Sequence, residues 1–178
     1  MCSWCSGHAD AFGLGGKQVP HAWGQAEEGF SRIYQQCSGS VLTAVRRVPG
    51  ANVFVTGHSL GGALATLATA DLAINGIASA MYNIASPRTG NTEFAAAFNA
   101  NGLIKARWRI VNTEDSVTTV PLATPRLGVE QGLSALATLV ALMEKLDYTH
   151  VGTAVNFTVN NSSIIANHDI NTYIAALA

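Results

Sequence analysis

Residues 52–74 read NVFVTGHSLGGALATLATADLAI, and this stretch carries most of the information about the fold. Its first five residues are β-prone, whereas the run after Gly57 is rich in Ala and Leu and predicts a helix. A strand that passes at once into a helix holds one residue at a sharp, strained turn, and here that residue is Ser59. Gly57 and Gly61 are expected to give the turn room, and Gly62 to let the helix approach the sheet.

Strands and helices alternate on both sides of this stretch. The expected helices cover 29–48, 91–100, 129–146 and 169–177, and the expected strands cover 79–84, 107–112 and 154–159. This alternation predicts an α/β fold in which helices cover both faces of a mostly parallel sheet. No internal repeat or second domain is visible, so residues 1–178 are expected to form a single domain that begins with an irregular segment at 1–28.

Ser59 needs partners if it is to act as a nucleophile. A serine hydroxyl attacks only when an imidazole takes its proton, and an acid must orient that imidazole and stabilise its charged form. Downstream, Glu114 and Asp115 follow the strand at 107–112, and His168 lies between the last strand and the final helix. Both places are carboxyl ends of strands, where parallel sheets hold their sites. A helix start that Ser59 merely caps is the alternative that the pattern leaves open.

The other four histidines do not fit this role. His58 lies inside the turn, where its side chain is expected to point away from the mouth of the nucleophile, and His150 precedes the last strand. We interpret both as structural. His8 and His21 have no metal-ligand spacing with any partner, so neither a metal nor a cofactor is predicted.

The composition excludes some partners. Charged residues make up only 12% of the 178 residues, and hydrophobic residues 48%, which favours apolar partners or self-association. A formal net charge of −1 without a basic cluster argues against a nucleic-acid partner. The longest apolar stretch, 133–143, is far shorter than the ~20 residues that span a bilayer, so no transmembrane segment is expected.

The first residues, MCSWCSGHAD, have neither the basic start nor the apolar run of a signal peptide. The sequence as written therefore predicts a cytoplasmic protein, and a secreted one if its true N-terminus is missing. Cys2 and Cys5 form a C-x-x-C with no strand before it, which we interpret as a terminal pair without redox or metal chemistry. With Cys37 as the third cysteine, no complete disulfide framework can be drawn.

From Gly29 to the C-terminus the sequence resembles the class 3, or fungal-type, lipases of the α/β-hydrolase superfamily. The resemblance rests on the order and spacing of GFSRIY (29–34), VTGHSLGGALATLA (55–68), YNIASPRTGNTEF (82–94), RIVNTEDSV (109–117) with a following Pro121, YTHVG (148–152) and NHDINTYI (167–174). In that family the serine of GHSLGG, the aspartate of N-x-x-D-x-V and a late histidine form a catalytic triad. The resemblance maps these roles onto Ser59, Asp115 and His168, and it favours Asp115 over Glu114.

The resemblance also implies an activity. The family hydrolyses carboxylic esters, chiefly acylglycerols, without a cofactor, and it includes phospholipases and feruloyl esterases. We therefore expect a serine esterase or lipase that acts on a lipid or other ester, with the backbone N–H of Leu60 as an oxyanion donor. An acyltransferase that uses the same triad is the catalytic alternative.

Two departures from the family pattern qualify this expectation. The resemblance implies several strands upstream of the helix at 29–48, one of which ends in a loop that gives a second oxyanion donor, and the chain has no room for them. We therefore predict an α/β-hydrolase that is truncated at its N-terminal side. Loss of one oxyanion donor costs about 10²–10³ in rate, so a weakly active or non-catalytic hydrolase domain is a further alternative.

The missing strand would leave an open edge beside the strand that precedes Ser59. Residues 1–28 or a second copy of the chain are expected to cover it. The second departure is the inserted helix at 129–146. It has two interpretations: a lid over the acyl site, or, as favoured, an amphipathic helix packed on the body or in a dimer contact. A homodimer through the open edge or this helix is thus expected.

Overall fold

The structure is a computed structural model that describes residues 23–119 and 148–178. Its main layer is a four-stranded, fully parallel sheet in the order β1–β2–β4–β6. The strands are β1 (Phe54–His58), β2 (Ser79–Ile84), β4 (Ile104–Asn112) and β6 (Thr153–Phe157). Within the described ranges β1 pairs with β2 alone, so β1 forms one edge of the sheet.

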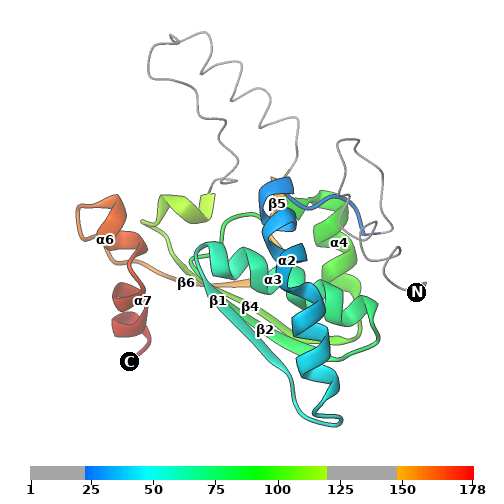
Figure 1. The fold of residues 1–178 in the computed structure, drawn as a ribbon. Coiled ribbons are helices and arrows are strands. Elements are labelled where there is room, and N and C mark those ends of the chain that lie inside the picture. The colour runs from blue at the N-terminus through cyan, green and yellow to red at the C-terminus, as the bar shows by residue number, and fades with distance from the viewer. Residues whose placement is uncertain (1–22, 120–147) are drawn as a thin grey trace, which may run out of the picture.

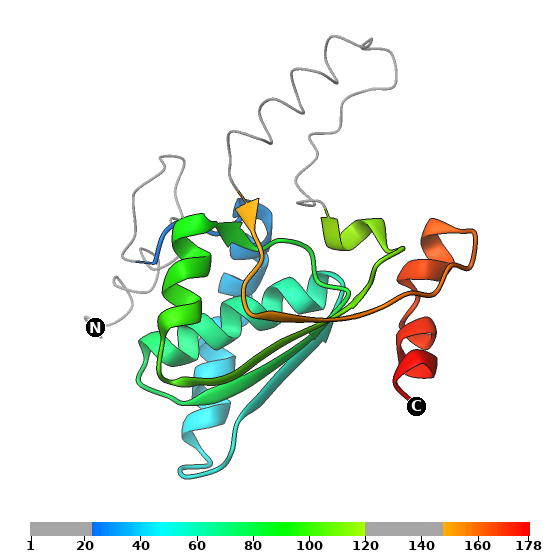
Figure 2. The ribbon, with the colours of Figure 1, turned by 180° about the vertical axis from the view of Figure 1, so that it is seen from behind.

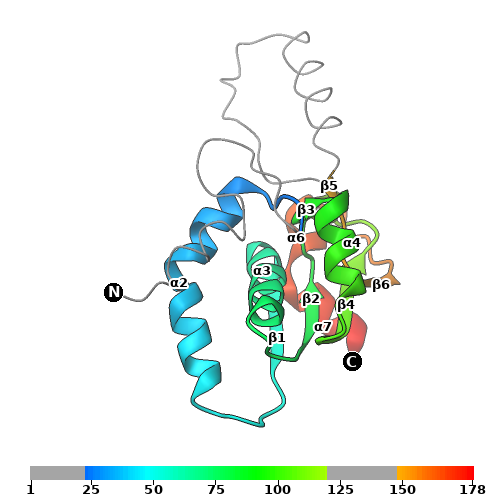
Figure 3. The ribbon, with the colours of Figure 1, turned by 90° about the vertical axis from the view of Figure 1, so that its right-hand side faces the viewer.

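Helices flank the sheet on both sides. Figure 3 shows α2 and α3 to one side of the strands. The described helices are α2 (Glu28–Arg46), α3 (Leu60–Ile74), α4 (Thr92–Ala100), α6 (Ile164–His168) and α7 (Ile170–Leu177), with a short 3₁₀ turn, η1 (Ser116–Thr119). After β6 the chain runs into α6 and α7, which stand beside the carboxyl ends of the strands (Figures 1 and 2). An α/β fold with a parallel sheet and helices on both faces is therefore confirmed.

Most predicted elements lie within three residues of the observed ones. The strand predicted at 52–56 is observed two residues later, and the strand predicted at 107–112 begins three residues earlier, at Ile104. The helix predicted at 129–146 lies outside the described residues, as does most of the irregular segment at 1–28. Those two expectations stay predictions.

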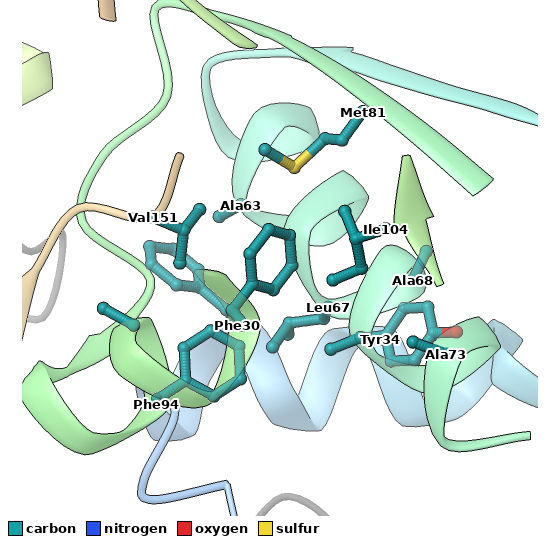
Figure 4. Packing of buried hydrophobic residues seen from close by; sticks show 13 residues of the cluster. Phe30, Tyr34, Ala63, Leu67, Ala68, Ala73, Met81, Phe94, Ile104 and Val151 are labelled. Atoms are coloured by element: carbon teal, nitrogen blue, oxygen red, sulfur yellow. The ribbon is translucent and has the colours of Figure 1, made fainter. Parts of the chain in front are cut away.

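The core lies between the sheet and the helices α2, α3 and α4. Phe30 of α2, Leu67 of α3 and Phe94 of α4 pack together there and are at most 3% exposed (Figure 4). Helix α3 is buried along nearly its whole length, which explains why its sequence is rich in Ala: small side chains let a central helix approach its neighbours closely. The core therefore anchors the helix that begins at Ser59.

The two faces of the sheet differ because side chains alternate along a strand. Met81 and Asn83 of β2 are fully buried under α3, and we call their side the inner face. Tyr82 points to the opposite side, in register with Thr56 of β1 and Trp108 of β4, and we call that side the outer face. Helix α7 lies on the outer side, because its Tyr173 contacts Phe157 of that face edge-on at 5.1 Å.

A second, two-stranded sheet was not predicted. It pairs β3 (Gly90–Asn91) with β5 (Tyr148–Thr149) in antiparallel fashion, and an isolated bridge joins Ala26 to Gly90. Asn91 also caps α4, because its side chain accepts a hydrogen bond from the backbone N–H of Phe94 at 2.9 Å. This small sheet fixes the entry into α2 and α4 on the inner side.

Candidate active site

The site is built around the turn between β1 and α3. Ser59 has φ 58° and ψ −127°, a combination that a non-glycine residue adopts only at a cost. Its backbone N–H donates to the carbonyl of Ile84 at 3.0 Å, and its own carbonyl accepts from the N–H of Gly62 at 2.9 Å. The neighbouring strand and the first turn of the helix thus hold the strained residue in place, with its hydroxyl at the carboxyl edge of the sheet.

The glycines around Ser59 have unequal roles. A Cβ at Gly57 would lie 2.0 Å from the carbonyl oxygen of Gly61, and one at Gly62 would lie 2.8 Å from the Cβ of Ser86. Both positions therefore exclude a side chain, as the sequence predicted. A Cβ at Gly61 would meet nothing within 4 Å outside its own helix, so the expectation that Gly61 itself must lack a side chain is wrong. What the turn needs from residue 61 is its backbone close to Gly57.

The structure brings the three residues of the predicted triad together. The Nε2 atom of His168 lies 2.7 Å from the Oγ of Ser59, and its Nδ1 lies 2.8 Å from the Oδ2 of Asp115. With the proton on Nδ1, the imidazole donates to the carboxylate and accepts from the serine hydroxyl. The side chain of His168 is 20% exposed, whereas that of Asp115 is fully buried.

The carboxylate of Asp115 is fully engaged. Its Oδ1 accepts from the backbone N–H of Val117 at 3.0 Å, and its Oδ2 accepts from His168 and from the hydroxyl of Tyr173 at 2.6 Å. Glu114, the rival acid, lies elsewhere: its Oε2 accepts from the side chain of Asn160 at 3.0 Å. The geometry therefore favours Asp115 as the partner of His168.

Two buried asparagines connect the loop that carries Asp115 to the helix that carries His168. The side-chain amide of Asn112 donates to the carbonyls of Val159 and Asn167, at 2.9 and 3.1 Å. Asn167 in turn donates to the carbonyl of Glu114 at 3.1 Å. Buried side chains that are hydrogen-bonded in this way fix the spacing between two loops that are far apart in the sequence.

His168 is the last residue of α6, a five-residue helix that the sequence did not predict. The helical run is interrupted at Asp169, whose side chain accepts from the N–H of Asn171 at 2.7 Å and so caps α7. A helix end followed at once by a new helix start leaves His168 at the corner between them. The corner faces the carboxyl ends of β1 and β4.

Two further side chains, which the sequence did not single out as site residues, support His168 and Asp115. Tyr173 is fully buried, and burial, together with its hydrogen bond to Asp115, raises the pKa of its hydroxyl, so it remains a protonated donor. His58 contributes its Nε2, which lies 2.9 Å from the backbone carbonyl of His168, and its ring centroid lies 4.8 Å from that of His168. For His58, the position directly before Ser59 was the only feature of the sequence that pointed to a place near the site.

His150 does not join this group. Its Nε2 lies 2.7 Å from the carbonyl of Thr118. Burial, with the positive charge of Arg109 as the second cause, lowers its pKa from 6.5 to about 4. A neutral, hydrogen-bonded histidine beneath η1 fits the structural role that the sequence suggested.

Leu60 begins α3, so its backbone N–H is one of the first four in the helix, which have no carbonyl of a preceding turn to donate to. Such a group can meet a negative charge beside Ser59. Within residues 23–119 and 148–178, no cluster of three or more His, Cys, Asp or Glu side chains could hold a metal ion. Among the same residues, no helix is both long and apolar enough to cross a membrane.

Parts of this sequence are similar to known proteins. The family model described as "Lipase (class 3)" matches residues 4–124, a range that includes Ser59 and Asp115. The secreted mono- and diacylglycerol lipase A of Penicillium cyclopium is 37% identical over 102 residues, which are 54% of this chain and 32% of that protein. The chloroplastic/mitochondrial phospholipase A1 EG1 of Oryza sativa subsp. indica is 34% identical over 145 residues, or 78% of this chain and 31% of that protein.

Solved structures agree with the sequence relatives. Lipase II from Rhizopus niveus matches with a TM-score of 0.62 at 25% identity, over 90% of this chain and 55% of that one. The chain thus spans about a third of the length of the two relatives named above and about half of this solved chain.

Proposed function

The chain belongs to the class 3 lipase family, and on this premise we propose that it is a serine esterase or lipase that cleaves lipid esters through an acyl-serine intermediate. The observation that carries the proposal is the unbroken hydrogen-bond path from the Oγ of Ser59 through both nitrogens of His168 to Asp115. A strained serine turn, an imidazole and a buried carboxylate together are the parts that acyl transfer to a serine requires.

In the acylation step, the Oγ of Ser59 attacks the ester carbonyl carbon while its proton passes to the Nε2 of His168. The buried carboxylate of Asp115 stabilises the imidazolium that forms and keeps Nδ1 protonated. Collapse of the tetrahedral intermediate breaks the bond to the alcohol oxygen. The proton on Nε2 then goes to that oxygen, the alcohol leaves, and the acyl group stays on Ser59.

Water completes the cycle by the same path in reverse. It gives a proton to the Nε2 of His168 as its oxygen attacks the acyl carbon, and the second tetrahedral intermediate releases the carboxylic acid. The proton returns to the Oγ of Ser59. In both intermediates the carbonyl oxygen carries a negative charge, and the N–H of Leu60 at the start of α3 is proposed to stabilise it.

The names of the relatives support a proposal for the substrate class. One is named as a mono- and diacylglycerol lipase and another as a phospholipase A1, so an ester of a glycerol lipid is the proposed substrate. A secreted location is supported by the name of the Penicillium protein, although the name of the rice protein places it in chloroplasts or mitochondria. A weakly active or non-catalytic hydrolase domain is the second candidate.

A panel of p-nitrophenyl esters of graded chain length tests the proposal. The wild-type chain is expected to release p-nitrophenol faster than the Ser59→Ala variant on at least one ester. Ser40→Ala, an exposed serine on α2, is the matched control and should leave the rate unchanged. Equal rates for the wild type and Ser59→Ala on every ester would leave only the non-catalytic candidate.

A further inference from the structure

The outer face of the sheet exposes large apolar side chains in one continuous area. Phe54 is 68% exposed, Trp108 41% and Val155 43%, although all three lie within strands. Tyr82 is 38% exposed, and its ring lies 6.4 Å from that of Phe54. The parallel register places all four on the same side of the sheet, because Thr56, Tyr82 and Trp108 form one row and Ile110 pairs with Val155 in the next.

None of the residues that the register pairs on this face is Asp, Glu, Lys or Arg, and Lys105 lies unpaired at a register shift near the start of β4. By the register, its members are Phe54, Thr56, His58, Ala80, Tyr82, Ile84, Ala106, Trp108, Ile110, Asn112, Thr153, Val155 and Phe157. The arginines of β4, Arg107 and Arg109, point to the inner side instead. A solvated sheet face normally alternates apolar inward and polar outward residues, and here the outward residues are also mostly apolar.

Of the described helices, α7 lies on the outer face, and it covers the carboxyl end of that face. Tyr173 contacts Phe157 and lies 6.1 Å from the ring of His58, both of which stand at strand ends. No described residue covers the start of β1 or the middle of β4, and three half-exposed aromatic rings with Val155 leave on the order of 400 Å² of apolar surface in water. The largest apolar patch of a typical monomer is about this size, and such a patch is often functional.

We propose that the outer face is the contact surface between two copies of this chain, packed sheet on sheet about a two-fold axis. A two-fold contact sets the same patch against itself, and a patch without charged side chains meets itself without repulsion. Two twisted sheets pack about 10 Å apart with interdigitated side chains, the arrangement that exposed Phe54, Tyr82 and Trp108 can supply. Ile174 and Leu177 on α7, 58% and 56% exposed on the same side of the sheet, extend the contact toward the ~800 Å² per partner of a stable interface.

A lipid surface fits the outer face less well. Surfaces that lie on membranes combine apolar side chains with Lys and Arg, and none of the residues that the register pairs on this face is Lys or Arg. The Ser59 hydroxyl also lies at the carboxyl edge of the sheet and not on this face, so a bilayer against the outer face would leave it to one side. A second copy needs neither a basic charge nor access to Ser59.

Sedimentation velocity from 1 to 100 µM, on the wild-type chain and on Tyr82→Lys and Trp108→Lys, tests this contact. The wild type is expected to form a dimer, and each lysine, which occurs twice in a two-fold contact, is expected to raise the dissociation constant at least about tenfold. Ile165→Lys on α6, where the side chain is 83% exposed, is the matched control and should dimerise as the wild type does. Far-UV circular dichroism verifies that each variant is folded.

The other occupants give different results. Pairing of the open β1 edges would leave Tyr82→Lys and Trp108→Lys unaffected, because β2 and β4 do not border that edge. Flotation of the wild type, but not of Trp108→Lys, with phosphatidylcholine vesicles would assign the face to lipid. Either of these results, or a wild-type chain that remains monomeric at 100 µM, overturns the proposal.

Discussion

The carboxyl end of the sheet and its outer face are made by the same four strands. They differ in how completely their polar groups are hydrogen-bonded and their apolar side chains are buried. At the carboxyl end, Asp115 is fully buried and both its oxygens are hydrogen-bonded. On the outer face, Phe54, at the start of the strand that leads to Ser59, is 68% exposed. The described residues thus suffice to organise the candidate site, but they do not cover the sheet behind it.

The largest expected effect concerns the carboxyl end of the sheet. Asp115→Asn keeps the shape of the side chain but removes the charge that holds Nδ1 of His168 protonated, so kcat for ester hydrolysis should fall about 10⁴-fold. Glu114→Gln is the matched control, since the Glu114 carboxylate bonds to Asn160 and not to His168, and its rate should be unchanged. A greater loss in Glu114→Gln than in Asp115→Asn would reverse the assignment of the acid.

Neighbouring residues of β2 test the contrast between covered and open surface. Met81 is fully buried on the inner face and Tyr82 is 38% exposed on the outer face. Met81→Lys should lower the free energy of unfolding by about 4 kcal/mol or more, because it buries an unpaired charge. Tyr82→Lys should lower it by less than about 1 kcal/mol at concentrations where the chain is monomeric. Urea unfolding of the two variants measures both, and equal losses would mean that the outer face is covered.

The stability of the fold should also depend on pH through the buried His150. Its pKa in the fold is about 4, against an ordinary value of 6.5. The unfolded chain therefore binds a proton below pH 6.5 that the fold does not accept until the pH nears 4. Stability is fully present above pH 6.5 and should fall by on the order of 3 kcal/mol as the pH drops to about 4. Comparison with His150→Gln, which should lack this part of the loss, isolates it in urea unfolding at pH 7 and pH 4.5.

The smallest expected effect joins the two regions, because Tyr173 packs on Phe157 of the outer face and donates to Asp115. Tyr173→Phe keeps the packing and removes the hydrogen bond, so kcat should fall about tenfold while KM stays near its wild-type value. The pH profile of kcat should shift as well, because Asp115 loses one of its two donors to Oδ2. An equal loss of kcat in Phe157→Leu, which disturbs only the packing, would contradict a role through the hydroxyl.

The sequence predicted the turn at Ser59 well because its signals are local. A β-prone run, a glycine pair and an Ala-rich run lie within about twenty residues, and β1 and α3 appear there. Elements that depend on distant pairing were missed. Strands β3 and β5 have two residues each, too few to show a period, and they form because Asn91 meets Tyr148 far along the chain.

The candidate site follows the same division. Ser59 and His168 could be selected from the motif and from chain order, and the family resemblance favoured Asp115 over Glu114. Nothing local indicated that Tyr173 donates to Asp115 or that α6 ends at His168. A five-residue helix leaves no periodic pattern, and a buried hydroxyl near a carboxylate is a property of the folded chain alone. Expectations for residues 1–22 and 120–147, a lid among them, lie outside the described residues.

The central claim is that His168 activates Ser59 as a nucleophile, and labelling with a fluorophosphonate tests it most directly. The probe reacts only with an activated serine, and mass spectrometry of peptides identifies the labelled residue. We predict labelling at Ser59, none in Ser59→Ala, and at least about 100-fold slower labelling in His168→Ala. An unlabelled Ser59 in the folded wild-type chain, or labelling that is as fast in His168→Ala as in the wild type, would contradict the account.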